Sequence, residues 1–243
     1  MSGHSKWHKI QHKKGKADKA RSGSFTKLLK AVEVAAMQGG SDADMNFSLR
    51  LAVEKAKASN VPKDNIQRAI KRGAGELDGE AAIEQIIYEG YGPGGIAVLV
   101  ECNTNNRNRT VAEVKHAFSK YGGSMGASGS VQWQFEHLAV IIFDSERKSA
   151  IDNWDEFEMS LIESGASDVL VSNSFVEIRG PKESFQTLVE AVETAGIVPE
   201  DSGLKWVAKD SLGVDEPTTL KMETLYEKLD ELDDVSDVYT NEA

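Results

Sequence analysis

Apolar residues between positions 21 and 75 recur every three to four residues, the spacing of one face of an α-helix. In a first predicted helix they are Phe25, Leu28, Leu29, Val32 and Ala36. In a second predicted helix they are Leu49, Val53 and Ala56. A third helix is expected from about Pro62 to Gly73, where Asp64 and Gln67 have the spacing of a capping box. The pattern therefore predicts a small three-helix unit.

The pattern changes after residues 73–80, a segment rich in glycine and acidic residues that we interpret as a linker. Shorter apolar runs with turn residues between them then predict an α+β unit. Its elements are a strand at 85–91, a Gly-Pro-Gly-Gly turn, a strand at 96–103, a helix at 110–120 opened by Thr110 and Glu113, a Gly/Ser loop at 122–129 and a strand with alternating Val131, Trp133 and Phe135.

Residues 138–210 predict a strand, a helix, two strands, a helix and a strand, which is the ferredoxin-like βαββαβ order. The helices are expected at about 148–164 and at 184–195. A last helix and strand follow, with Leu220, Leu225, Leu229 and Leu232 on the helix and residues 237–239 in the strand. Because the βαββαβ unit is already complete, we expect these last elements to close the earlier sheet.

The predicted fold class is therefore α+β with three domains. A helical domain precedes two α+β (ferredoxin-like) domains, of which the third is inserted into the second. The expected boundaries are 1–80 for the basic arm and helical domain, 81–135 with 211–243 for the second domain, and 136–210 for the inserted domain.

Charge is divided unevenly along the chain, whose formal net charge is −11. Residues 1–75 hold 16 Lys and Arg against 6 Asp and Glu, whereas the remainder holds 12 against 33. The excess is densest in an arm at residues 1–21, with Lys6, Lys9, Lys13, Lys14, Lys16, Lys19 and Arg21. Such asymmetry is typical of a chain with one end that faces a polyanion. A solvated, disordered tail is the alternative.

Other signals narrow the class of protein. The longest apolar run, residues 138–143, is far too short to span a membrane, and the N-terminus has no apolar segment of a secretory signal. Cys102 is the single cysteine, which excludes an intrachain disulfide and suggests a small buried apolar residue. We therefore expect a cytoplasmic protein without a membrane partner.

Two motifs suggest cofactors or metals and are rejected. The glycines of residues 90–95 match G-x-G-x-x-G, but an apolar strand follows them instead of a helix, so they indicate a hairpin turn. His4, His8 and His12 have helical spacing, but the surrounding lysines disfavour a bound cation. No cofactor and no metal are predicted.

Three features are candidates for nucleic-acid contact: the lysines of the arm, Trp7, and the loop that holds Arg107 and Arg109. Trp7 can stack on a base or anchor the arm to the helical domain. Arg107 and Arg109 lie in an Asn-rich loop before a helix and can hold phosphate, or they can pair with Glu101 or Glu113. The predicted contact residues are Lys6, Trp7, Lys9, Lys13, Lys14, Lys16, Lys19, Arg21, Lys27, Arg107 and Arg109.

Two acidic clusters could in principle hold Mg²⁺ for a nuclease. They are Asp152, Asp155, Glu156 and Glu158, and Asp230, Glu231, Asp233 and Asp234. Each cluster lies on or beside an amphipathic helix, as a solvated face would, and no His or Ser joins it. We therefore interpret both clusters as solvated faces that keep nucleic acid away from the domains that carry them.

Segments along nearly the whole chain carry a family resemblance. They are GHSKW at 3–7, FTKL at 25–28, LAVEKA at 51–56, PKDNI at 62–66, GYGPGG at 90–95, NRNRTVAE at 106–113, FSK at 118–120, GS at 129–130 and VYTN at 238–241. In this order they resemble the YebC/PmpR family, related to the mitochondrial translational activator of cytochrome c oxidase. The resemblance implies a helical domain, two α+β domains and no enzymatic activity. It also implies transcriptional regulation through DNA or action on the ribosome.

Our hypothesis is a non-enzymatic, nucleic-acid-binding regulator of gene expression, specifically a DNA-binding transcriptional regulator. The alternative target is ribosomal RNA, for a translation factor. The absence of an obvious row of base-reading side chains at helical spacing favours recognition of shape or backbone. A metal-dependent nuclease, and a scaffold that binds a protein partner through the α+β domains, are hypotheses of different classes.

Overall fold

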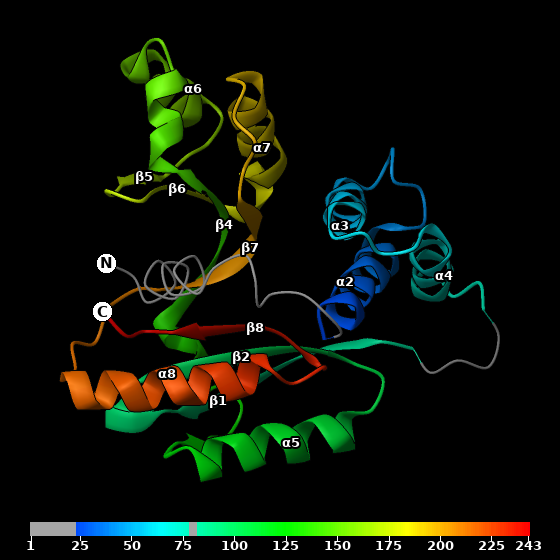
Figure 1. Cartoon of the computed structure of the whole chain (residues 1–243), viewed down its shortest axis with the longest axis vertical. Coiled ribbons are helices and arrows are strands. Elements are labelled where there is room, and N and C mark those ends of the chain that lie inside the picture. The colour runs from blue at the N-terminus through cyan, green and yellow to red at the C-terminus, as the bar shows by residue number, and fades with distance from the viewer. Residues whose placement is uncertain (1–22, 78–81) are drawn as a thin grey trace.

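The computed structural model describes residues 23–77 and 82–243, and the predicted basic arm lies outside them (Figure 1). The described part opens with three helices: α2 (Gly23–Gly39), α3 (Phe47–Ala58) and α4 (Lys63–Gly73). They confirm the predicted three-helix unit. In Figure 1 they lie together at one side of the molecule.

The helical unit has its own apolar core, to which α2 contributes Val32 and Ala36. A Cβ at Gly73 would collide with the carbonyl oxygen of Glu33, so α4 can cross α2 closely only with glycine there. The predicted capping box of α4 was wrong. The helix starts directly after Pro62, without a side-chain cap, which places Asp64 inside the first turn, where its charge still favours the helix.

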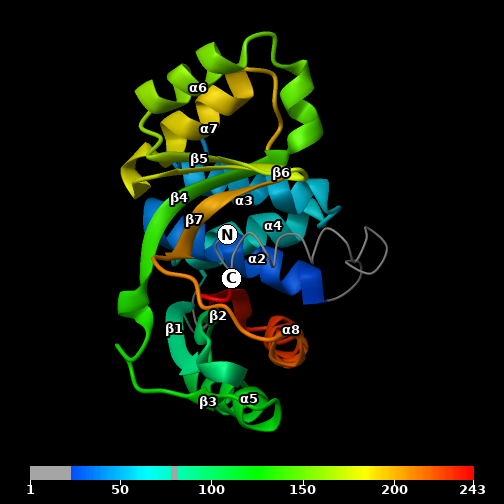
Figure 2. The ribbon, with the colours of Figure 1, turned by 90° about the vertical axis from the view of Figure 1, so that its left-hand side faces the viewer.

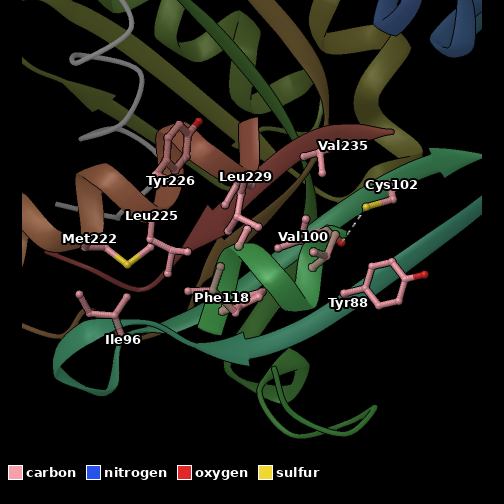
Figure 3. Packing of buried hydrophobic residues seen from close by; sticks show 14 residues of the cluster. Tyr88, Ile96, Val100, Cys102, Phe118, Met222, Leu225, Tyr226, Leu229 and Val235 are labelled. Carbon is pink, nitrogen blue, oxygen red and sulfur yellow. Dashed lines mark hydrogen bonds between the residues drawn. The ribbon is translucent and has the colours of Figure 1, made fainter. Parts of the chain in front are cut away.

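The first sheet has the strand order β3-β1-β2-β8, and the paired strands are antiparallel. Its strands are β1 (Glu84–Tyr91), β2 (Ala97–Thr104), β3 (Ser124–Met125) and β8 (Val235–Thr240). The helices α5 (Arg107–Lys120) and α8 (Glu216–Asp230) pack against it through one buried cluster. Figure 3 shows Phe118 of α5 and Leu229 of α8 close to Val100 of β2.

Two details of this unit bear on the predictions. Cys102 is fully buried in the same cluster, and burial raises the pKa of its thiol to about 12, so it behaves as a small apolar residue. Leu220, which the pattern placed on the apolar face of α8, is exposed. The buried residues of α8 are Met222, Leu225, Tyr226 and Leu229.

The second sheet has the antiparallel order β5-β6-β4-β7. Its strands are β4 (Phe135–Asp144), β5 (Asp168–Val171), β6 (Phe175–Gly180) and β7 (Asp201–Ala208). With α6 (Trp154–Glu163) and α7 (Phe185–Thr194), the chain order is the predicted βαββαβ. In Figure 2, α6 and α7 lie at one end of the molecule and α5 at the other, with the two sheets between them.

The two sheets differ in how the chain threads them. Strand β8, the last strand of the chain, pairs with β2 of the first sheet, with Thr240 opposite Val98. In sequence, the whole second sheet therefore lies between β3 and β8 of the first sheet. The first sheet does not have the βαββαβ order that its description as ferredoxin-like implies. Its elements run strand, strand, helix, strand, helix, strand, the order that the apolar pattern predicted, although the third strand is β3 at Ser124–Met125. The domain boundaries themselves stay predictions.

The predicted strand at 131–135 was wrong. The backbone N–H groups of Val131 and Gln132 each donate to the buried carboxylate of Glu89 at 2.8 Å, so they are not available to a strand ladder. A short 3-10 turn, η2 (Gln132–Gln134), takes its place, and Trp133 is exposed. The alternation of large apolar residues there does not reflect a buried strand face.

The predicted helix at 148–164 was wrong at its start. The chain first forms a separate 3-10 segment, η3 (Ser145–Ala150), and α6 begins only at Trp154. Asn153 caps α6 by accepting a hydrogen bond from the N–H of Glu156. The ammonium of Lys148 lies 4.2 Å from the centre of the Trp154 ring, so the two segments still pack together.

Candidate nucleic-acid interface

Exposed cations gather on α3 and α4. They are Lys55, Lys57, Lys63, Arg68 and Lys71. Lys57 and Lys63 border a groove between the two helices, with Val53, Ile66 and Ile70 among its lining residues. Within the helical unit this surface offers several ammonium and guanidinium groups in a chain whose net charge is −11. Among these cations, Lys55 pairs with Asp201 at 3.4 Å, and the same two helices also expose Glu54 and Asp64.

The arm residues of the prediction lie outside the described residues. They are Lys6, Trp7, Lys9, Lys13, Lys14, Lys16, Lys19 and Arg21, together with His4, His8 and His12. Their role in nucleic-acid contact stays a prediction. The remaining three predicted residues, Lys27, Arg107 and Arg109, are described, and they lie at the end of the first sheet where α5 begins.

The N-cap of helix α5 lies four residues earlier than Thr110, the cap that the capping-box spacing indicated. Asn106 is its N-cap, and the side-chain oxygen of this residue accepts a hydrogen bond from the N–H of Arg109 at 3.1 Å. Arg107 is exposed in the first turn. Thr110, the expected cap, instead lies within the helix and is buried. Its hydroxyl donates a hydrogen bond to a carboxylate near the C-terminal end of the chain.

That carboxylate is Asp234, whose side chain is only 1% exposed. The Nη2 of Arg109 donates to its two oxygens at 2.9 and 2.7 Å, and the Nε donates at 3.1 Å. The hydroxyls of Thr104 and Thr110 lie within 3.2 and 2.7 Å, and the ammonium of Lys30 completes the shell. The partners predicted for Arg109, Glu101 and Glu113, do not form its ion pair.

Burial by itself would raise the pKa of Asp234. The hydrogen bonds from Lys30, Arg109 and Thr110 outweigh it and lower the pKa to about 2. Asp234 is therefore ionised at neutral pH, and Lys30 and Arg109 share its single negative charge. The interpretation of residues 230–234 as a solvated face was wrong for this residue.

We call residues 230–234, which begin at the last residue of α8, the acidic turn. Lys27 of α2 donates to the carbonyl oxygen of Asp230 and, at 3.1 Å, to its carboxylate. Lys30 donates to the carbonyl oxygen of Asp233 at 2.8 Å as well as to Asp234. The acidic turn thus binds two lysines of the helical unit, and one of them, Lys27, is a predicted nucleic-acid contact.

Sequence reasoning missed Lys30 and the role of Asp234. Lys30 and Asp234 are 204 residues apart in the chain, and Arg109 and Asp234 are 125 apart. No periodicity or local motif connects positions so far apart. Only the pairing of β2 with β8 brings the acidic turn to the start of α5, where Asn103 N–H donates to the backbone oxygen of Asp234 at 2.8 Å.

A second titratable group lies on the other side of β2. Burial, followed by repulsion from Asp237, raises the pKa of Glu101 to about 7, although Tyr239 and Gln85 donate hydrogen bonds to it. A carboxyl group with a raised pKa in the folded state stabilises the fold only while it is protonated. That contribution is complete below the ordinary pKa of 4.5 and is lost as the pH rises through about 7.

We expect Glu101→Gln to remove this pH dependence, because the amide resembles the protonated acid. At about pH 8 the variant should be more stable than the parent by about 3 kcal/mol, and at about pH 4.5 the two should be nearly equal. Urea unfolding at both pH values measures this difference. Glu136→Gln, which removes an exposed carboxylate, shows the effect of charge alone. A Glu101→Gln effect that is equal at both pH values would contradict the assignment.

Three further observations concern the described part of the chain. Among residues 23–77 and 82–243, no three His, Cys, Asp or Glu side chains are arranged to hold a metal ion. In the same residues, no helix is long and apolar enough to cross a membrane. Glycines 92, 94 and 95 form the turn between the antiparallel strands β1 and β2, which confirms a hairpin in place of a dinucleotide fingerprint.

Comparison with known proteins extends over almost the whole chain. A curated relative from Maridesulfovibrio salexigens is 47% identical over 99% of this chain and 95% of its own length. A relative from Thermoanaerobacter pseudethanolicus is 46% identical, with 99% and 96% covered. Both carry the name "Probable transcriptional regulatory protein".

A solved structure and two family descriptions agree with these relatives. The crystal structure of a conserved hypothetical protein from Aquifex aeolicus superposes with a TM-score of 0.83 at 40% identity, covering 94% of this chain and 92% of that one. The family description "TACO1/YebC protein N-terminal domain" matches residues 5–76, and "TACO1/YebC second and third domain" matches residues 83–242. The chain therefore belongs to the TACO1/YebC family.

Proposed function

We propose that this protein is a non-enzymatic, DNA-binding transcriptional regulator that contacts nucleic acid through its N-terminal arm and helical unit. The observation that carries the proposal is the concentration of positive charge in that part of an acidic chain. Lysines and arginines neutralise phosphates and release counterions, which supplies affinity without reading sequence. The negative charge elsewhere disfavours any other face for a polyanion.

The names of the relatives support a regulatory role. Relatives at 45–47% identity that cover nearly the whole chain are called probable transcriptional regulatory proteins. The exposed face of α4 adds Gln67 and Arg68, side-chain types that can pair with base edges in a major groove. In this proposal the α+β units either hold the helical unit in position or bind a protein partner.

The experiment is crosslinking in living cells, followed by sequencing of the DNA and the RNA recovered with the full-length protein. We expect discrete DNA sites whose recovery falls in the variant Lys13→Ala/Lys14→Ala/Lys16→Ala. The control variant, Lys182→Ala/Lys209→Ala/Lys221→Ala, loses three exposed lysines outside the helical unit. Reads concentrated on ribosomal RNA, and lost in the arm variant, would replace the DNA target by the ribosome. Equal recovery in both variants would refute binding through the arm.

A further inference from the structure

The contact between α2 and the acidic turn imitates a contact with phosphates. The ammonium groups of Lys27 and Lys30 each meet one carboxylate and one backbone carbonyl oxygen: those of Asp230 for Lys27, and Asp234 with the carbonyl of Asp233 for Lys30. A nucleic-acid backbone presents the same kind of oxygen acceptors with the same negative charge. In the free protein the acidic turn therefore forms ion pairs with Lys27 and Lys30, two cations of the basic N-terminal part.

This contact differs from the other contacts of the helical unit. Helix α3 meets the second sheet unit through apolar rings, with Phe47 and Phe185 5.5 Å apart at an angle of 74°. Of the buried apolar residues of α2, Val32, Ala35 and Ala36 belong to the core of the helical unit, whereas Val34, which has helical spacing from Lys30 and Gln38, is buried outside that core. The contacts of Lys27, Lys30 and Gln38 with the first sheet unit are polar, with Gln38 bonded to Gln85 at 3.1 Å.

Polar contacts of this kind can be exchanged. The side chains of Lys27 and Asp230 are 21% and 45% exposed, and an ion pair with access to water contributes little to stability and weakens as salt rises. Arg109 and the two threonines still satisfy Asp234 when Lys30 leaves, because they belong to the first sheet unit. Release of α2 therefore leaves no carboxylate buried without partners.

From these contacts we infer that the acidic turn is an internal competitor of nucleic-acid phosphates for Lys27 and Lys30, so that binding of nucleic acid releases α2 from the first sheet unit. This inference rests on the proposed function. It assigns the turn an autoinhibitory role, in which the free protein keeps two of its cations engaged until a polyanion displaces Asp230 and Asp234. The apolar contact of α3 with the second sheet unit stays in place.

A carbodiimide test reports the contact directly, because this reagent joins an amine to a carboxylate only where the two touch. In the free full-length protein we expect a crosslink between Lys27 and Asp230, identified by mass spectrometry of the peptides. Lys228 and Glu231, 2.6 Å apart at the same turn but without contact to α2, supply an internal control. Saturating duplex DNA or single-stranded RNA should suppress the first crosslink and leave the second. Persistence of both would overturn the inference.

Two matched variants test the competition through their affinities for nucleic acid. Asp230→Asn removes the carboxylate that pairs with Lys27 and leaves only the backbone carbonyl contact, whereas Glu231→Gln removes the same charge from the same turn, where Glu231 bonds to Lys228. At about 0.1 M salt we expect Asp230→Asn to bind a labelled duplex DNA about fivefold more tightly than Glu231→Gln, with a salt slope steeper by about 0.9. For single-stranded RNA the slope should change by about 0.7.

The outcomes separate this inference from the proposed function. Tight binding by the parent with equal affinities of Asp230→Asn and Glu231→Gln would overturn the competition alone. Weaker binding by Asp230→Asn would also overturn it, because the turn would then position the lysines for nucleic acid. Binding of neither DNA nor RNA by the parent protein would overturn the proposed function and the competition together.

Discussion

Replacement of Asp234 by alanine is expected to lower the free energy of unfolding by about 3–5 kcal/mol, the largest effect of any single change near the acidic turn. The carboxylate is buried and accepts hydrogen bonds from Arg109, Lys30 and two threonine hydroxyls. Its removal leaves Arg109 and Lys30 without a counter-charge and two hydroxyls without an acceptor. Urea denaturation at neutral pH, followed by circular dichroism, measures the loss.

The pH dependence of the same contact supplies an independent check. Because the pKa of Asp234 is lowered to about 2 in the folded protein, its ionisation stabilises the fold above the ordinary value of 3.8. That contribution, about 2 kcal/mol, is lost as the pH falls from about 4 to about 2. The parent should therefore lose this part of its stability on acidification, and Asp234→Asn should not.

Glu231→Ala is the control, since Glu231 lies in the same turn and is 62% exposed. A surface change of this kind alters stability by no more than about 0.5 kcal/mol. Equal stabilities of Asp234→Ala and Glu231→Ala would show that the network around Asp234 contributes nothing to the fold. That result would contradict the geometry described above.

The second large effect is expected on binding. Replacing Lys13, Lys14 and Lys16 together by alanine should weaken binding to duplex DNA about a hundredfold at about 0.1 M salt, because three phosphate contacts are lost. The slope of log K against log salt should become shallower by about 2.7. Fluorescence anisotropy titrations over a series of salt concentrations give both quantities.

The matched control carries the same change of charge at Lys182, Lys209 and Lys221, which are exposed outside the helical unit. Its affinity should fall far less, since these positions lie among the acidic α+β units. If the two triple variants bind alike, net charge alone governs the interaction and the arm has no special role. If neither variant differs from the parent, the polyanion interpretation of the arm is wrong.

Local features of the fold were accessible from the sequence. The spacing of Val32, Val53 and Ile66 predicted three helices, because a helix that buries one face repeats every three to four residues. The βαββαβ order of the second sheet followed from runs of apolar residues separated by turns. Where a buried polar group overrides the pattern, the prediction failed, as it did where Glu89 holds Val131 and Gln132 in a turn.

Helix starts were also predicted poorly. Thr110 and Glu113 have the spacing of a capping box, but Asn106 caps α5 and Thr110 turns inward to Asp234. The same residue types cap helices and bind buried carboxylates, so spacing alone does not distinguish the two uses. The candidate site was affected in the same way: for Arg109 the sequence left phosphate or the nearby Glu101 and Glu113 as alternatives, and the structure pairs it with Asp234 instead.

The sequence by itself determined the class of elements, the three-part layout and the division of charge between the basic N-terminal part and the acidic remainder. These properties depend on composition and on neighbours a few residues apart. Only the tertiary structure decided which of the cations form ion pairs with the acidic turn. Lys27, Lys30 and Arg109 meet Asp230 and Asp234 because β8 pairs with β2 and α2 lies against both strands. Contacts between residues more than a hundred positions apart leave no periodic trace in a single sequence, so the fold alone brings them together.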